Sequence, residues 1–120
     1  MIKVLILEDE ETLGQIYKKK IEENSYDVLW TKTSQETKEA VKSFKADILL
    51  IDHGIKGEGR SGISIIPFLR KELPQSKIIV LSNYSKFQFE EEAFKAGADD
   101  FLVKINTPPN ILLNYLKNLH

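Results

Sequence analysis

The chain of 120 residues contains no cysteine, which excludes a disulfide framework, a thiolate metal site and a cysteine nucleophile. It also lacks an excess of charge of one sign: 17 Lys and Arg residues balance 18 Asp and Glu residues, which argues against nucleic-acid binding by bulk electrostatics. No hydrophobic run is long enough to span a bilayer, and acidic residues 8–11 interrupt the apolar start too early for a signal peptide. We therefore expect a cytoplasmic protein that neither inserts into a membrane nor binds nucleic acid directly.

What is present is the composition of a folded domain. Hydrophobic residues make up 42% of the chain and charged residues 29%, which argues against intrinsic disorder. A chain of this length buries roughly two-thirds of its extended surface on folding, so it can form a core unaided. Since no repeat, low-complexity tract or linker interrupts the sequence, we expect one domain over residues 1–120.

Short apolar runs alternate with longer amphipathic stretches along the whole chain. The runs contain almost no polar residue, which is typical of strands buried on both faces, whereas the stretches between them have helical spacing. Strands are predicted at residues 2–7, 27–31, 48–51, 77–81 and 101–103. This alternation predicts a doubly wound α/β fold, with a five-stranded parallel sheet, right-handed crossovers and helices on both faces.

The predicted helices have features that the structure can test. Ser34 is a candidate N-cap of the second helix. Pro67 is comfortable only in a first turn, so the third helix should begin late, near Ser64. The apolar stripes of the first and last helices, which include Ile16 and Ile111, are predicted to face the sheet.

Polar residues directly follow four of the predicted strands: Glu8-Asp9, Asp52, Ser82 and Lys104. The carboxyl ends of parallel strands share one edge of a sheet, where open α/β folds bind their ligands. Crowded carboxylates repel each other, and a Mg²⁺ ion with Asp9 and Asp52 as ligands, and Glu8 acting through water, would relieve the repulsion. A serine hydroxyl and a lysine opposite the cation suit phosphoryl transfer, with Asp52 as the best candidate nucleophile.

These residues stand in a pattern that resembles the receiver domain of two-component response regulators. The resemblance covers essentially the whole chain: Glu8-Asp9 follow VLIL, Asp52 follows ADILLI, Ser82 closes KIIVLS and Lys104 ends GADDFLVK. It implies the flavodoxin-like (βα)5 fold with strand order 2-1-3-4-5. It also implies a phosphoprotein that acts in a phosphorelay and is not a metabolic enzyme, although it has Mg²⁺-dependent self-phosphorylation and self-dephosphorylation chemistry.

The resemblance also implies partners and roles. A sensor histidine kinase or histidine phosphotransfer protein would donate the phosphoryl group, and a downstream protein target would read a face made by the fourth helix, fifth strand and fifth helix. Movement of Ser82 toward the phosphoryl group would open space for an aromatic switch residue. The implied residues are Asp52 as acceptor; Asp9, Asp52 and the backbone carbonyl of Gly54 for Mg²⁺ (or Mn²⁺); Ser82 and Lys104 for the phosphoryl oxygens; and Phe101 as the switch.

The sequence departs from the family pattern at several positions. The loop after Asp52 has Lys56-Gly57 and is about two residues longer than usual in the segment GEGRSG, at residues 57–62. Ile105 replaces the cis proline that usually follows the lysine, so we expect a trans bond there. Asn83 and Tyr84 stand where access to the phosphoryl group is modulated. We expect Tyr84 to shield it and to slow self-dephosphorylation.

Rival functions fit less well. The main alternative is a receiver-like interaction module whose altered loop has silenced phosphorylation. A haloacid-dehalogenase-like phosphatase needs a second acid where Gly54 stands, and Walker-type hydrolysis needs a GxxxxGK[ST] loop that is absent. A flavin carrier would need a Ser/Thr/Gly-rich loop after the first strand, where EDEET stands instead. His53 has no partner histidine and is interpreted as a loop residue rather than a metal ligand.

Overall fold

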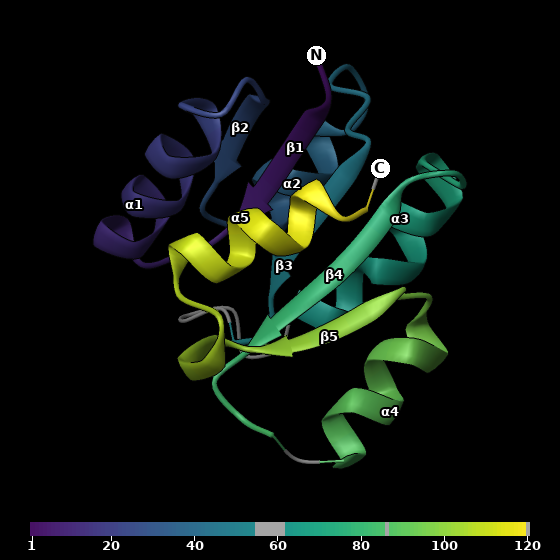
Figure 1. Cartoon of the computed structure of the whole chain (residues 1–120). Coiled ribbons are helices and arrows are strands. Elements are labelled where there is room, and N and C mark those ends of the chain that lie inside the picture. Colours follow the sequence, from purple (N-terminus) through teal and green to yellow (C-terminus); the bar gives the residue numbers. More distant parts are fainter. Residues whose placement is uncertain (55–61, 86, 120) are drawn as a thin grey trace.

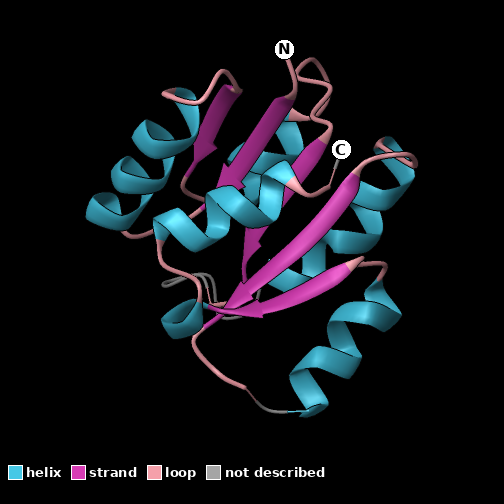
Figure 2. Ribbon diagram, viewed as in Figure 1, coloured by secondary structure: helices cyan, strands magenta, loops and turns pink. Residues whose placement is uncertain are grey.

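Strands and helices alternate throughout this computed structural model, which describes residues 1–54, 62–85 and 87–119 (Figure 1; Figure 2). The first half contains β1 (Lys3–Leu7), α1 (Glu11–Glu22), β2 (Asp27–Thr31), α2 (Ser34–Ala40) and β3 (Ile48–Asp52). The second half contains a 3₁₀ turn (Gly62–Ile65), α3 (Ile66–Glu72), β4 (Lys77–Ser82), α4 (Phe87–Ala96), β5 (Asp100–Val103), a second 3₁₀ turn (Lys104–Asn106) and α5 (Pro109–Lys117).

The strands form one parallel sheet in the order β2-β1-β3-β4-β5, which confirms the predicted fold class and strand order. The ladder places the strand ends together: Leu7 pairs with Ile51, Asp52 with Leu81, and Ser82 with Val103. The residues that follow β1, β3 and β5, and the end of β4, therefore meet at one edge of the sheet. No helix in the described part of the chain is long and apolar enough to cross a membrane.

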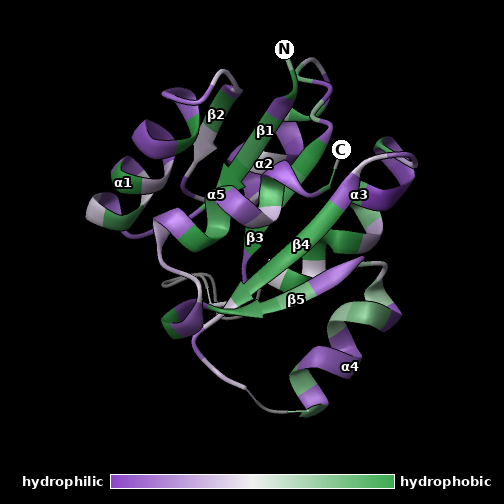
Figure 3. Ribbon diagram, viewed as in Figure 1, coloured by the Kyte–Doolittle hydropathy of each residue, from purple (hydrophilic) through white to green (hydrophobic). Residues whose placement is uncertain are grey.

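The sheet separates two hydrophobic cores because successive strand residues project to opposite faces. On one face, α1 and α5 contribute residues such as Tyr17 and Leu116. On the other face, α2, α3 and α4 cover the sheet, with Leu69 and Ala93 among the buried residues. Figure 3 shows the central strands as almost uniformly hydrophobic, whereas α1 and α4 are hydrophobic on only part of their surface. The strand sequences are therefore apolar because the two layers of helices cover both faces.

Two details of the first and last helices differ from prediction. Ile16 and Ile111 are exposed, at 46% and 50%, instead of facing the sheet. Trp30 of β2 lies so close to Gly14 that a Cβ there would collide with the indole, so α1 presents Gly14 and not Ile16 to β2. The α5 helix buries the neighbouring leucines, including Leu112, and this orientation turns Ile111 outward.

The start of α2 was also predicted one residue late. Thr33, not Ser34, is the N-cap: its hydroxyl accepts a hydrogen bond from the Glu36 amide at 3.0 Å. Thr33 has the extended backbone that an N-cap needs, whereas Ser34 is already the first helical residue and is buried. The late start of the third helix is confirmed, since the 3₁₀ turn precedes α3.

Arg70 of α3 connects three segments at the edge of the sheet opposite the carboxyl ends of the strands. Its guanidinium donates to the Gly97 carbonyl, through Nε at 3.1 Å and Nη2 at 2.7 Å, and to the Ser76 carbonyl through Nη1 at 2.7 Å. It also forms an ion pair with Asp99 at 2.7 Å. Gly97 has φ +120°, a conformation that favours glycine, so the turn after α4 is specified both by its residue type and by Arg70.

Candidate functional site

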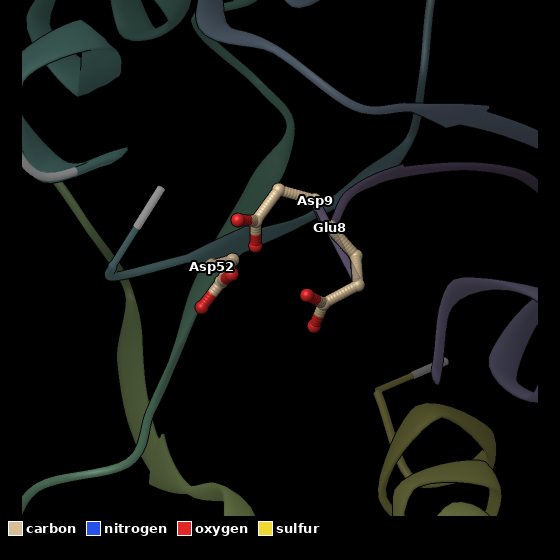
Figure 4. A group of neighbouring side chains, drawn as sticks. All are labelled: Glu8, Asp9 and Asp52. Atoms are coloured by element: carbon tan, nitrogen blue, oxygen red, sulfur yellow. The ribbon is translucent and has the colours of Figure 1, made fainter. Parts of the chain in front are cut away.

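Three carboxylates converge at the carboxyl edge of the sheet. Glu8 and Asp9 follow β1, and Asp52 ends β3. Each offers an oxygen atom, and these atoms lie within 4.8 Å of one another. Figure 4 shows the three side chains directed toward a common space. Glu8 and Asp52 are only 2% and 3% exposed, so their charges are largely withdrawn from water.

Lys104 enters this cluster from the 3₁₀ turn that follows β5. Its Nζ lies 2.8 Å from Glu8 Oε1 and 2.9 Å from Asp52 Oδ1. The side chain is only 12% exposed, so the ion pairs are screened weakly. The peptide bond to Ile105 is trans, as predicted, and the lysine still reaches both carboxylates.

The electrostatics of the cluster are dominated by burial. Burial raises the pKa of Asp52 to about 7, while hydrogen bonding to Lys104 acts in the opposite direction. The nearby charge of Glu8 and a hydrogen bond with Asp9 raise the Asp52 pKa further. Burial disfavours the charged form of Lys104 too, but its contacts with Glu8 and Asp52 outweigh this and raise its pKa. The lysine is therefore charged and held in place, whereas Asp52 populates both its protonated and its ionised form near pH 7.

The donor set fits a hard divalent cation. Glu8, Asp9 and Asp52 offer only oxygen atoms, and the single ammonium of Lys104 does not balance three carboxylates. Mg²⁺ uses one or two carboxylates and keeps several waters, which suits a cluster with Asp9 at its half-buried rim. Gly54, predicted to add its carbonyl, is an exposed residue two positions after Asp52, and its role as a ligand stays a prediction.

A glycine beyond the loop is required by the packing around Asp52. A Cβ at Gly62 would collide with the Asp52 carbonyl oxygen. The Gly62 amide also donates to the His53 carbonyl at 2.7 Å, which closes the loop beside the site. The predicted departures at Lys56-Gly57, and the extra length of this loop, lie in residues 55–61, outside the described residues.

Ser82 lies in the neighbouring strand but its hydroxyl faces another partner. It is fully buried, and its Oγ lies 2.9 Å from Nδ1 of His53 and accepts a hydrogen bond from the Tyr84 amide at 3.0 Å. Of the predicted site residues, Glu8, Asp9, Asp52 and Lys104 thus come together, whereas the Ser82 hydroxyl contacts His53 and the Tyr84 amide. Its contact with the phosphoryl group stays a prediction.

His53 has a role that the sequence interpretation missed. It is 7% exposed, and burial lowers the pKa of its imidazole and so favours the neutral form, although the charge of Glu92 acts in the opposite direction. Its ring contacts Phe89 at 4.6 Å between centroids, with Tyr84 and Phe101 at 6.3 and 6.5 Å. His53 does follow the end of β3, as the loop interpretation has it, but its side chain is buried and has partners, which that interpretation did not include. Its alternation with Leu49 and Ile51, which face the α2–α4 core, would have indicated this.

The two predicted modulating residues lie at the rim of this region. Tyr84 is 54% exposed, and its ring lies edge-on to His53 and 5.8 Å from Phe89. Asn83 is exposed, and Phe101 is half-buried on the α4 side of β5. The effects of Asn83 and Tyr84 on the phosphoryl group stay predictions.

Trp30 supports the acidic turn and was missed as a site residue. Its Nε1 donates to the Glu8 carbonyl at 2.9 Å, and the Glu8 amide donates to the Thr31 carbonyl at 3.0 Å. The Glu8 carboxylate also accepts from the Glu10 amide at 3.1 Å. The end of β2 therefore positions the backbone from which Glu8 and Asp9 project.

Comparisons with known proteins match this geometry. The sequence model described as the response regulator receiver domain matches residues 4–115. The chain is 34% identical over 111 residues to the chemotaxis protein CheY of Thermotoga maritima, covering 92% of this chain and 91% of that protein. It is 28% identical to the transcriptional regulatory protein CitT of Bacillus subtilis, covering 96% of this chain but 52% of CitT. The chain thus spans about half the length of CitT.

Solved structures agree. A response regulator from Thermotoga maritima is 26% identical with a TM-score of 0.84, and the match covers 98% of this chain and 96% of that one. A CheY-like receiver domain protein from Methanospirillum hungatei is 22% identical with a TM-score of 0.89, over 98% of this chain and 92% of that one, and at this identity it supports the fold alone. The matched residues, the shared topology and the acidic cluster lead to one conclusion: this chain belongs to the response regulator receiver domain family of two-component signalling.

Proposed function

We propose that this receiver domain accepts a phosphoryl group on Asp52 from the phosphohistidine of a histidine kinase or phosphotransfer protein, with Mg²⁺ (or Mn²⁺) held by Asp9, Asp52, Glu8 and the Gly54 carbonyl. Receiver domains are signalling modules that work with kinases and downstream effectors, and their acidic pocket binds Mg²⁺. The observation that carries the proposal is the reach of Lys104 across the sheet edge to Glu8 and Asp52, at 2.8 and 2.9 Å. A charged lysine buried against the acceptor is placed to stabilise phosphoryl oxygens.

The reaction requires a nucleophile, charge neutralisation and a leaving group. A carboxylate oxygen of Asp52 attacks phosphorus, the P–N bond of the donor breaks, and its electron pair stays on the donor imidazole nitrogen. Lys104 shifts its hydrogen bond from Asp52 to a phosphoryl oxygen while Glu8 keeps it in place. When bound, Mg²⁺ supplies positive charge to the phosphoryl oxygens and allows the carboxylates to remain ionised.

The phosphorylated protein would then present a changed surface to its target. In this proposal Ser82 donates to a phosphoryl oxygen, and Phe101 responds on the same side of β5. The target surface is the face formed by α4, β5 and α5, which includes the exposed Phe87 and Phe94. The phosphoryl group shifts this equilibrium only through contacts that differ between the two states.

The test is the intact mass of the protein after incubation with Mg²⁺ and acetyl phosphate. Wild-type protein should gain one phosphoryl group, and Asp52→Asn should gain none, because the amide has the same size but is not a nucleophile. Asp47→Asn is the matched control, since Asp47 lies at the opposite edge of the sheet and caps the Lys3 amide at 2.8 Å. A phosphoryl adduct on Asp52→Asn would contradict the acceptor assignment, and no adduct on the wild type would favour the phosphorylation-silent interaction module.

A further inference from the structure

We propose that His53 is a positioning residue that retains the Ser82 hydroxyl on the α4 side of the sheet, so that Ser82 must leave His53 before it can donate to a phosphoryl group on Asp52. This inference rests on the proposed function and adds to it a competing partner for Ser82. That competing partner is His53, the residue immediately after the acceptor Asp52. The hydrogen bond between His53 and Ser82 therefore opposes the phosphorylated state.

The hydrogen-bonding capacity of Ser82 makes the two partners exclusive. A serine hydroxyl has one hydrogen to donate and two lone pairs to accept with. Its Oγ already accepts from the Tyr84 amide and lies 2.9 Å from Nδ1 of His53, which accepts the hydroxyl hydrogen when the ring carries its own hydrogen on Nε2. Because Ser82 is fully buried, water does not substitute for either partner. With the ring in this tautomer, donation to a phosphoryl oxygen requires the bond to His53 to break.

The position of His53 in the sheet places this competitor on the face opposite the acceptor. The ladder continues one residue past β3, since the His53 amide donates to the Leu81 carbonyl at 2.9 Å. Consecutive residues of a strand project to opposite faces, so Asp52 joins Glu8 and Lys104 while the His53 ring joins Phe89. Ser82 alternates with Ile78 and Val80, which face the same core as Leu49 and Ile51, so its hydroxyl lies on the His53 side and must turn to reach a phosphoryl group on Asp52.

Release of Ser82 would also affect α4. A buried imidazole that loses its hydrogen-bond partner incurs a desolvation cost unless its ring moves. The ring contacts Phe89 of α4 at 4.6 Å between centroids, with Tyr84 and Phe101 nearby. Rotation of His53 therefore disturbs a side chain of α4, Phe89, that its ring contacts. The same residue that retains Ser82 thus connects the pocket to α4.

Two matched substitutions separate the hydrogen bond from the packing. Asn places a polar atom where Nδ1 stands, whereas Leu places a methyl group there with nearly the same shape. The probe is beryllium fluoride, a phosphoryl mimic, titrated with Mg²⁺ into the full chain. His53→Leu should bind it about fivefold more tightly than wild type, the factor that corresponds to one net hydrogen bond. The affinity of His53→Asn for beryllium fluoride should remain close to that of the wild type.

The same pair in a Ser82→Ala background provides the control. There, His53→Leu should no longer change the affinity, because no hydroxyl remains to compete for. An unchanged affinity of His53→Leu with Ser82 present, or an equal gain in the Ser82→Ala background, would overturn the inference but leave the proposed function intact. If wild-type protein fails to bind the probe, the proposed function fails and this inference fails with it.

A spectroscopic measurement reports the hydrogen bond in wild-type protein without relying on any His53 variant. The ¹⁵N shift of His53 Nδ1 should indicate a hydrogen-bonded acceptor in the free protein and should change when beryllium fluoride binds. Ser82→Ala should produce that change in the absence of the probe. An Nδ1 shift that is insensitive to both would overturn the inference.

Discussion

The two helices that flank β5 are held very differently. The α5 helix buries Leu112, Leu113 and Leu116, and the Tyr115 hydroxyl donates to Asp100 at 2.6 Å. The α4 helix buries only Ala93 among its residues and leaves Phe87 and Phe94 exposed, at 75% and 43%. Both helices are amphipathic, so their sequence patterns alone do not separate them.

This difference divides the region into a fixed side and a loosely held side. Burial of apolar surface is the largest favourable contribution to folding, so α5 belongs to the stable core. Segments with few buried apolar contacts open locally at low free-energy cost. The α4 helix has that character, and it receives the Phe89–His53 contact from the site. A signal from the acidic pocket is therefore expected to move α4 and to leave α5 in place.

The largest effect that would test this division is on stability. Leu116→Ala should lower the free energy of unfolding by about 3 kcal/mol, because a fully buried leucine leaves a cavity. Phe94→Ala, the control on α4, should cost less than about 1 kcal/mol although it removes a larger side chain. Urea denaturation measures both values. Equal losses would show that α4 is held as firmly as α5.

A second effect, smaller in size, comes from the acidic pocket. Asp52 has a folded pKa of about 7 and an ordinary value of 3.8, so the folded state takes up its proton first as the pH falls. Without metal, stability should therefore rise by about 2 kcal/mol between pH 8 and pH 5, relative to Asp52→Asn. Thermal unfolding at several pH values measures this. Saturating Mg²⁺ should remove the difference, and a rise that persists in Asp52→Asn would assign it to another group.

Hydrogen exchange should then reveal the difference directly in the wild type. Amides of α4 should open at a free energy at least about 1 kcal/mol below those of α5, because fewer buried side chains resist opening. Amide exchange followed by NMR measures both helices in one sample. Protection of α4 equal to that of α5 would contradict the comparison, whatever the mutational results.

The smallest effect is expected at the most exposed aromatic residue. Phe87→Ala should change the free energy of unfolding by less than about 0.5 kcal/mol, because the ring is 75% exposed. If Phe87 belongs to the target surface, the same variant should weaken target binding by much more. A large loss of stability would place Phe87 in the core instead.

The fold and the charged half of the site could be predicted from the sequence because both depend on strand ends. Apolar runs locate the strands, and a parallel sheet then brings Glu8, Asp52 and Lys104 together whatever the details of packing. The Lys104 contacts need only the correct strand order, and for that reason the trans bond to Ile105 does not disturb them.

The features that the sequence did not predict depend on how individual side chains are oriented toward near neighbours. Trp30 reaches the Glu8 carbonyl because Gly14 allows close approach of α1, and no periodicity of either residue indicates this. The bond between His53 and Ser82 joins residues on different strands, where composition is uninformative and only alternation along each strand helps. The N-cap was assigned to Ser34 instead of Thr33 because both are good caps and only the backbone conformation distinguishes them.

The guanidinium of Arg70 determines how α4 is able to respond. It fixes the Gly97 carbonyl, at the carboxyl end of α4, to α3 and to the start of β4. Because the carboxyl end of α4 is fixed, the helix can move only by rotating about that end. The displacement then increases along the helix toward Phe87. Phe87, the most exposed aromatic residue of α4, lies at the end that moves most. A small rotation of α4 at the edge of the sheet therefore becomes a larger displacement of the surface that a target would contact.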